Sequence, residues 1–206
     1  MDLEKIIDYP KMKSPFVRKD IDGNYLAINE FEEGYNWLYD TGVIAVDKIH
    51  GSNLCVIFQD GKLIYIDNRK NRILESPAIS TDHNRLNRMA IEGVLSAIDR
   101  GWIPKGYTGR VYGELVGPKM NGNLHLLDRY YFVPFDYLKN HCAWNSWVSG
   151  KYPKSFESIK DWFELMPSLF TKRIMKVEAP AEGLVFYHPN GYKAKIRKDF
   201  FDYKRK

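Results

Sequence analysis

Lys48 is the residue with the clearest chemical potential in this chain of 206 residues. It ends an apolar run at residues 43–47, Gly51 follows, and a second apolar run begins at Leu54. This order predicts a strand, a tight turn and a second strand, with the lysine at the mouth of the turn. A lysine placed there is only partly solvated, and desolvation or neighbouring cations lower the pKa of an amine until it becomes a nucleophile. A plain hairpin whose lysine points into water is the alternative interpretation.

Two carboxylates that adjoin glycines, Glu114 and Glu182, could complete such a site. Glu114 lies in a predicted strand at residues 109–117, and Glu182 precedes another at residues 183–187. An adjacent glycine lets a ligand or another backbone come close. A lysine that attacks a nucleotide α-phosphate needs a divalent metal on the phosphates, and Mg²⁺ prefers carboxylate oxygens together with water and phosphate. Glu114 and Glu182 are therefore the candidate metal ligands, and Asp136 could join them or orient a neighbour.

Three cations share one face of a predicted strand at residues 192–197. Lys193, Lys195 and Arg197 alternate with apolar residues, and alternate side chains of a strand point to the same side. Like charges in a row repel one another. The pattern therefore predicts either a solvated sheet edge with protective lysines or a face along which a phosphate chain lies. In the second case Lys193 and Lys195 would bind the phosphates and stabilise a leaving pyrophosphate.

Aromatic and basic residues near these segments add two further candidates. Residues 130–138 predict an aromatic strand, in which Pro134 indicates an edge or a bulge. Phe132 or Phe135 in that strand could provide a platform for a purine base. The run at residues 67–72, which contains Arg69, brings several candidate phosphate or carboxylate binders to the end of a strand, although a solvated loop is the commoner meaning of such a run.

The elements that position these residues form a predicted α+β domain of antiparallel sheets with two packing helices. Amphipathic spacing predicts helices at residues 82–100, capped by Asp82 and ended by Gly101, and at residues 155–166. The sequence contains no repeat, linker or domain boundary, so residues 1–206 are predicted to form a single domain. Tight turns are predicted at Asp22-Gly23, Asp60-Gly61 and Pro189-Asn190-Gly191.

Composition narrows the class of protein. The chain has 31 Lys and Arg against 26 Asp and Glu, a net charge of +5, which suits a polyanionic partner without proving one. Neither a signal peptide nor an apolar span is present, so we expect a cytosolic protein with no membrane partner. Cys55 and Cys142 lie far apart and indicate neither a disulfide nor a zinc site, and Cys55 is predicted to be a core residue.

The order of these segments resembles that of the covalent nucleotidyltransferases, the superfamily of ATP-dependent ligases and mRNA capping enzymes. Its members carry Lys-x-Asp/His-Gly, then a Glu strand, an aromatic-Asp strand, Glu-Gly and a final Lys-x-Lys. All five occur here in that order, and Lys-Ile-His-Gly followed by Asn53 is similar to the RNA ligase 2 branch, which includes phage and kinetoplastid RNA-editing ligases. The five segments are residues 48–53, 112–117, 132–136, 182–185 and 193–195.

The resemblance implies an ATP-dependent RNA ligase with a nucleotidyltransferase (ATP-grasp-like) domain. In this mechanism Lys48 attacks the α-phosphate of ATP and forms a lysyl-AMP with the help of Mg²⁺ or Mn²⁺. The AMP then moves to the 5′-phosphate of a nicked or broken strand, and a 3′-hydroxyl attacks to seal it. A phage or virus-encoded protein would fit this branch.

The resemblance also implies a role for each matching residue. Glu114 would contact the ribose, and Phe135 would stack on adenine, with Phe132 as the less favoured choice. Glu182 would serve the metal site through its water shell. His50 is expected only to stabilise the turn with a hydrogen bond. The remaining members of the predicted nucleotide-binding set are Lys193 and Lys195, which would hold the α-phosphate, and Asn53 and Arg69, which would act mainly in strand joining.

Ligases of this superfamily usually carry a second domain after the last motif, and here little more than residues 199–206 remains beyond the last predicted strand. No C-terminal OB-fold or helical domain is recognisable, so the chain resembles the adenylyltransferase domain alone. Three alternatives remain open: a DNA ligase, which more usually has Asp at the position of His50; a capping guanylyltransferase that uses GTP; and a nucleic-acid-binding module that has lost catalysis.

Overall fold

The computed structural model describes residues 3–75, 85–144, 147 and 154–202. The chain divides into two compact units, each built from two separate stretches. The first unit comprises Met1–Pro10 and His50–Tyr137, and the second comprises Lys11–Ile49 and Leu138–Lys206. The single-domain interpretation stays a prediction.

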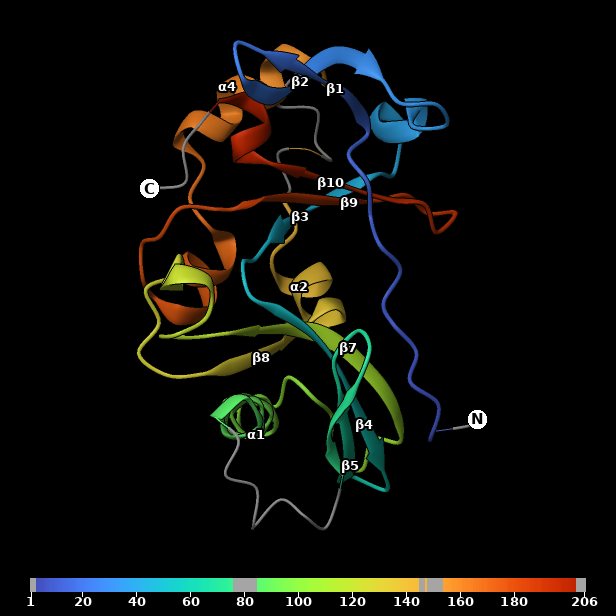
Figure 1. The fold of residues 1–206 in the computed structure, drawn as a ribbon, viewed down its shortest axis with the longest axis vertical. Coiled ribbons are helices and arrows are strands. Elements are labelled where there is room, and N and C mark those ends of the chain that lie inside the picture. The colour runs from blue at the N-terminus through green and yellow to red at the C-terminus, as the bar shows by residue number, and fades with distance from the viewer. Residues whose placement is uncertain (1–2, 76–84, 145–146, 148–153, 203–206) are drawn as a thin grey trace. The chain divides into compact units, whose positions relative to one another are not determined.

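The first unit contains a five-stranded antiparallel sheet in the order β6-β5-β4-β7-β8 (Figure 1). Helix α1 packs on one face, where Gly93 approaches Leu115 and the backbone of Phe132. Residues 4–7 are tied to side chains of this unit, because Arg72, Arg110 and Tyr112 donate hydrogen bonds to their carbonyl groups. The elements are β4 (Ser52–Gln59), β5 (Lys62–Asp67), β6 (Arg72–Glu75), α1 (Arg85–Asp99), β7 (Gly109–Val116), the short 3-10 helix η3 (Asn121–Asn123) and β8 (Tyr131–Pro134), after which α2 (Phe135–His141) leads into the second unit.

The second unit contains a three-stranded antiparallel sheet in the order β10-β9-β3 and a separate hairpin, β1-β2. One face of the three-stranded sheet carries small and apolar side chains that join the core with residues of α4. Ser155 caps α4 by accepting a hydrogen bond from the Ser158 N–H. The elements are β1 (Phe16–Ile21), β2 (Asn24–Phe31), η1 (Asn36–Tyr39), β3 (Ile44–Lys48), α4 (Phe156–Leu165), the π-helix η4 (Phe170–Met175), β9 (Gly183–Tyr187), β10 (Lys193–Arg197) and η5 (Lys198–Phe201).

The predicted α+β class with antiparallel sheets is confirmed, and so are the three tight turns. Each turn joins a paired hairpin and has a glycine with positive φ, namely 80° at Gly23, 76° at Gly61 and 90° at Gly191. The predicted helix at residues 155–166 forms as α4, and Gly101 follows α1 with a φ of 68°. The predicted cap at Asp82 lies outside the described residues.

The two strands predicted on either side of Lys48 form as β3 and β4. They do not make the alternative hairpin, because β3 pairs with β9, whereas β4 pairs with β5 and β7. One prediction about strands is wrong. The aromatic segment at residues 130–138 ends its extended part at Pro134, and Phe135 and Asp136 open helix α2 instead. β8 is nevertheless an edge strand, as Pro134 indicates.

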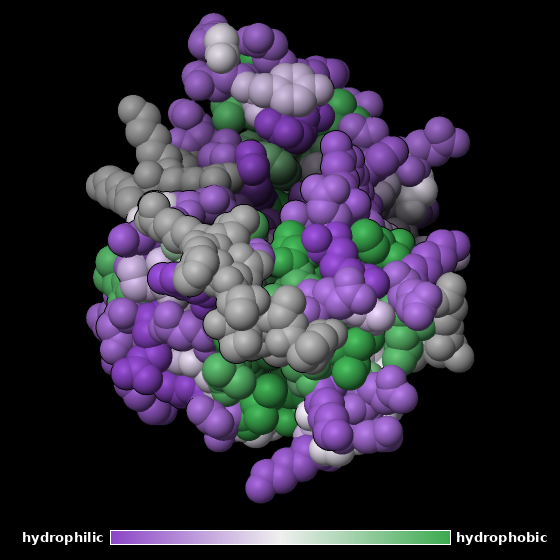
Figure 2. Space-filling model, turned by 60° about the horizontal axis from the view of Figure 1, so that its bottom comes forward, coloured by the Kyte–Doolittle hydropathy of each residue, from purple (hydrophilic) through white to green (hydrophobic). Residues whose placement is uncertain are grey.

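No helix among the described residues has both the length and the apolar character needed to cross a membrane. Apolar side chains do reach the surface between polar ones, and on the face drawn in Figure 2 they gather in its lower half.

The buried carboxylate of Asp47 is an unusual feature of the core face of β3. Its side chain is 1% exposed, and Oδ2 accepts hydrogen bonds from Ser168 Oγ at 2.7 Å and the Phe170 N–H at 2.8 Å. Desolvation raises the pKa of Asp47 to about 6, although these hydrogen bonds act in the opposite direction. Asp47 thus joins β3 to the start of η4 through a group that is costly to ionise.

Protonation of Asp47 predicts how stability depends on pH. The pKa in the folded state, about 6, is above the ordinary value of 3.8. The folded protein therefore binds more protons than the unfolded chain between these values, and the free energy of unfolding falls as pH rises from about 4 to 6, by at most about 3 kcal/mol. Urea unfolding across this range should show the fall in the wild type and a smaller one in Asp47→Asn. Asp161→Asn, at an exposed carboxyl of α4, should behave like the wild type, and an unchanged slope in Asp47→Asn would contradict the assignment.

Candidate active site

The register of the three-stranded sheet places Lys48 on the same face as the basic side chains of β10. Lys48 is opposite Gly183 of β9, and Gly183 is opposite Arg197 of β10. Directly opposed residues of antiparallel strands project to the same side, so Lys48 and Arg197 share a face two strands apart. Lys195 and Lys193 lie on this face as well, since they alternate with the buried Ala194 and Ile196. The predicted separation of cations from core residues on β10 is confirmed.

Glu182 lies at the head of β9, as predicted, and forms an ion pair with Lys48. Lys48 Nζ is 2.5 Å from Glu182 Oε2. The side chain of Glu182 is 3% exposed and that of Lys48 is 17% exposed. The lysine is therefore only partly solvated, as its position in the sequence predicts, and a carboxylate holds its amine in one place.

The glycine between Lys48 and Arg197 is required by the packing of the sheet. A β-carbon added at Gly183 would collide with the Ile196 carbonyl oxygen and would lie 2.8 Å from the Cα of Arg197. Any larger residue would push β10 away from β9. The absence of a side chain at Gly183 also leaves the sheet face open between the two cations.

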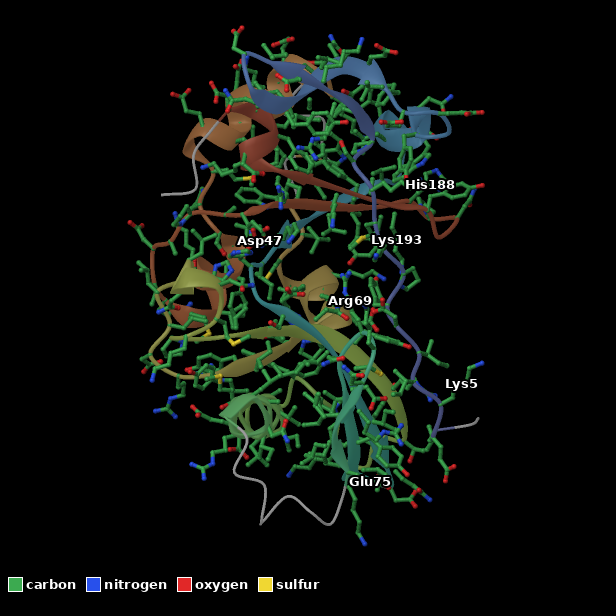
Figure 3. The ribbon with its side chains drawn as sticks, in the orientation of Figure 1. Lys5, Asp47, Arg69, Glu75, His188 and Lys193 are labelled. Atoms are coloured by element: carbon green, nitrogen blue, oxygen red, sulfur yellow. The ribbon has the colours of Figure 1, made fainter. Side chains whose placement is uncertain are left out.

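Lys193 and Lys195 are held differently along β10. Lys193, labelled in Figure 3, has its Nζ 5.9 Å from the centroid of the Tyr187 ring on β9. The backbone N–H of Lys195 donates a hydrogen bond to the Lys13 carbonyl at 3.0 Å, which brings the segment before β1 beside β10. Both side chains are half-buried.

In the first unit, three side chains fix the backbone of His50 and Gly51. The His50 N–H donates to His125 Nε2 at 2.7 Å, and the Gly51 N–H donates to Glu114 Oε1 at 3.1 Å. The Asn121 amide donates to the Gly51 carbonyl at 2.7 Å. Gly51 also packs so closely on the backbone of Leu115 that a β-carbon would not fit. The segment immediately after Lys48 is therefore held by its neighbours rather than by its own turn chemistry.

Asn53 and Glu114 are directly opposite each other on β4 and β7, so the first unit brings these two predicted residues together. Arg69 follows β5, and its Nε is 3.9 Å from Asp8 Oδ1. The Arg69 side chain is 47% exposed, so this ion pair is a weak one.

The two aromatic candidates have different surroundings. Phe132 is fully buried in β8, and its ring lies against Gly113, which leaves it no open face for a base. Phe135, at the first position of α2, is half-buried, and its ring centroid is 4.7 Å from that of Tyr9. Asp136 is exposed in the first turn of the same helix. Of the two, only Phe135 is placed where a ligand could reach it.

The predicted metal ligands fit an ion held mainly by phosphate and water. Among the described residues, no three His, Cys, Asp or Glu side chains gather into a group that could hold a metal by themselves. Mg²⁺ at nucleotide sites commonly takes only one or two protein carboxylates and completes its shell with water and phosphate oxygens. Glu182 beside Lys48 matches that requirement in the second unit, and Glu114 offers a carboxylate in the first unit.

The cysteines offer no second nucleophile. Both are buried, and the prediction of a core position for Cys55 is confirmed. Burial raises the pKa of the Cys55 thiol to about 11 and that of Cys142 to about 12. Neither thiol therefore supplies a useful fraction of thiolate near neutral pH.

Several residues of these sites were not found from the sequence. His125 and Asn121 lie in an irregular segment, where Asn121, Gly122 and Asn123 all have positive φ, and nothing in their spacing indicates the turn they hold. The same is true of the partners of Asp47, because Ser168 is 121 residues away in the chain. The only feature of the sequence that indicated a turn near these residues was the Asn-Gly-Asn run at residues 121–123.

Solved structures with a similar fold come from an RNA ligase of Naegleria gruberi. A lysine-to-alanine mutant of that ligase with ATP and Mn gives a TM-score of 0.50 at 16% identity, covering 96% of this chain and 65% of that chain. An apo mutant gives a TM-score of 0.49 at 16% identity and covers 96% and 64%. At this identity the likeness concerns the fold, and the chain spans less than two thirds of the length of these ligases.

The sequence comparisons identify the family. No curated protein matches the sequence. The family model described as RNA ligase matches residues 41–201, which include all five segments singled out in the sequence. Because this match spans most of the chain, the chain belongs to the RNA ligase family.

Proposed function

We propose that this chain is an ATP-dependent RNA ligase that acts through a lysyl-AMP on Lys48. The observation that carries the proposal is the Lys48–Glu182 ion pair on a sheet face that also carries Lys193, Lys195 and Arg197. A lysine held by a carboxylate beside Lys193 and Lys195 suits an attack on a phosphate. The membership in the RNA ligase family supports RNA as the substrate.

In the proposed first step, Lys48 Nζ forms a bond to the α-phosphorus of ATP, and the bond between the α-phosphorus and the bridging oxygen to the β-phosphate breaks. Lys48 must first give its extra proton to the Glu182 carboxylate or to water, and pyrophosphate leaves with the electron pair of the broken bond. Glu182 fixes the position of the amine, so little orientation is lost when the nucleotide arrives. Lys193 and Lys195 would neutralise charge on the α-phosphate as it forms in the transition state. A divalent ion, when bound, would neutralise the remaining phosphate charge.

The first unit would contribute recognition of the nucleotide and of the strand. Glu114 fixes the backbone after Lys48 through Gly51, and we propose that its carboxylate also contacts the ribose. Phe135 would stack on adenine. Asn53 and Arg69 would act in the later steps, in which AMP moves to a 5′-phosphate and a 3′-hydroxyl displaces it.

The first prediction from the proposed function tests the nucleophile. The wild-type protein, incubated with α-labelled ATP and Mg²⁺ and then denatured, should retain the label, and Lys48→Ala should retain none, because it has no amine to form the bond. Lys160→Ala, a change of the same kind at an exposed lysine of α4, should label as the wild type does.

The outcomes separate the alternatives. Label from GTP instead of ATP would assign the protein to the capping guanylyltransferases. No label from either nucleotide, with pyrophosphatase present and no AMP already bound, would contradict the proposed function and favour a nucleic-acid-binding module without catalysis.

The second prediction concerns the metal. If Glu182 serves the metal site through its water shell, Glu182→Gln should raise the Mg²⁺ concentration needed for half-maximal labelling by about tenfold to a hundredfold. Glu178→Gln, at an exposed carboxyl four residues earlier, is the matched control and should leave this concentration unchanged. A lower labelling rate in Glu182→Gln without any change in the Mg²⁺ dependence would assign Glu182 to positioning Lys48 alone.

The third prediction concerns the strand. We expect joining of 5′-phosphate and 3′-hydroxyl ends in nicked RNA duplexes to be faster than in otherwise identical DNA duplexes, because the chain belongs to the RNA ligase family. A gel-based joining assay with both substrates, started from the preformed lysyl-AMP protein, measures this directly. Equal or faster joining of DNA would favour the DNA ligase alternative.

A further inference from the structure

A cavity lies within the second unit at the outer edge of β10. β10 pairs with β9 on one side, and on its other side the Lys195 N–H bonds to Lys13. The segment that carries Lys13 therefore runs along the free edge of the sheet. A cavity of about 440 Å³ lies between this segment, the β1-β2 hairpin, β10 and η5.

The lining of this cavity is strongly positive. It includes four cations and, among the described residues, one carboxylate. The carboxylate, Glu32, is exposed to solvent. Such an excess of one charge around a concave surface attracts an anion. The four cations are Lys13, Arg18, Lys195 and Arg197.

Two of the cations are arranged so that they repel each other. The guanidinium carbons of Arg18 and Arg197 lie 4.0 Å and 4.8 Å from the centroid of the same ring, that of Phe200. Burial and the charge of Arg197 lower the pKa of Arg18. The Nε atoms of both arginines are buried and have no hydrogen-bond partner in the structure. An anion with several acceptor oxygens would relieve the repulsion between the two guanidinium groups and could accept hydrogen bonds from them.

Other bonds of the two arginines fix them in place. Arg18 Nη2 donates to the Tyr25 carbonyl at 2.7 Å, and Arg197 Nη2 is 2.9 Å from Asp199 Oδ2. The Arg18 guanidinium also lies 4.4 Å from the centroid of the Tyr25 ring. Tyr25 itself is 58% exposed, so ring surface remains available for stacking. A positive cavity beside an exposed aromatic ring is a typical arrangement for a single nucleic-acid strand.

We propose that this cavity binds a phosphodiester of the RNA strand near the end that is joined, with an adjacent base stacked on Tyr25. The identity of the strand rests on the proposed function. Arg197 is in register with Lys48 two strands away, about 10 Å given the usual spacing of strands. Lys195 belongs both to this cavity and to the cation row on the face of Lys48. A strand whose end reaches Lys48 can therefore cross β10 and enter the cavity.

The test uses the whole chain and a short 5′-phosphorylated single-stranded RNA, without ATP or metal, at several salt concentrations. Arg18→Gln and Lys13→Gln should each weaken binding by about fivefold or more and reduce the salt dependence by about 0.7 per lost contact. Lys13→Gln keeps the backbone bond to Lys195, so it remains informative if Arg18→Gln unfolds. Lys19→Gln removes an exposed cation of β1 that neighbours Arg18 but lies outside the cavity. This variant should bind RNA as the wild type does.

Two further variants test stacking on the Tyr25 ring. Tyr25→Leu should weaken RNA binding by about fivefold or more, because it removes the stacking surface. Tyr25→Phe keeps that surface and should bind nearly as the wild type does. Equal affinities of the two variants would overturn the assignment of Tyr25.

Nucleotide phosphates carry the same chemistry as the strand, so the assay includes ATP. The proposal expects the loss of RNA affinity in Arg18→Gln and Lys13→Gln to exceed any rise in the ATP concentration for half-maximal labelling. The opposite result, or full competition of RNA by inorganic tripolyphosphate at micromolar concentration, would assign the cavity to nucleotide phosphates and overturn the proposal. If Arg18→Gln and Lys13→Gln bind RNA with the same affinity as the Lys19→Gln control, the proposal is overturned as well.

Failure of this inference can be told apart from failure of the proposed function. Wild-type labelling by ATP together with unchanged RNA affinity in the cavity variants would overturn the cavity alone. Absence of labelling together with RNA binding that depends on Arg18 would overturn the ligase activity and leave the cavity as a nucleic-acid site.

Discussion

The pairing register of β3, β9 and β10 is the constraint on which the proposed chemistry depends. In this register Lys48, Gly183 and Arg197 form one row, and Lys195 and Lys193 follow on the same face. A slip of one residue in any strand would reverse its faces. Lys48 would then point into the apolar core, and the buried Asp47 would take its place. The apolar residues on the opposite face thus specify the position of Lys48, the proposed nucleophile.

The Lys48–Glu182 pair is better explained by positioning than by stability. Glu182 is almost fully buried, and the free energy of removing a carboxylate from water is often as large as the attraction to its partner. Replacing such a pair with apolar residues would cost the fold little. The pair holds the amine at a fixed point beside other cations, so that reorganisation would be small in the proposed attack on a phosphate. Lys48 is also the more exposed partner, which leaves it accessible to a nucleotide.

The sequence predicted best what depends on neighbouring residues. The alternation of residues along β10 predicted which of its faces is polar, and glycines predicted the three tight turns. The amphipathic spacing of residues predicted the length of α4. Long-range pairing could not be found this way: β3 lies directly before the turn that leads to β4, yet its partner β9 begins 135 residues after Lys48. Pro134 marked the end of β8 but not the helix that starts at Phe135. The hydrogen bonds that fix the backbone of His50 and Gly51, and the cavity that Arg18 lines, depend on side chains that come together only in the folded chain.

Gly183 is important both for the packing of β10 on β9 and for the proposed site at Lys48. Because β10 approaches β9 too closely for a β-carbon, the row between Lys48 and Arg197 carries no side chain. Arg197, directly opposite Gly183 on β10, lies over the Phe200 ring together with Arg18. A larger residue at Gly183 would move β10 outward and change two things together: the gap next to Lys48 and the spacing of the two arginines. The packing at Gly183 therefore bears both on the gap next to Lys48, the proposed nucleophile, and on the strand that carries Arg197.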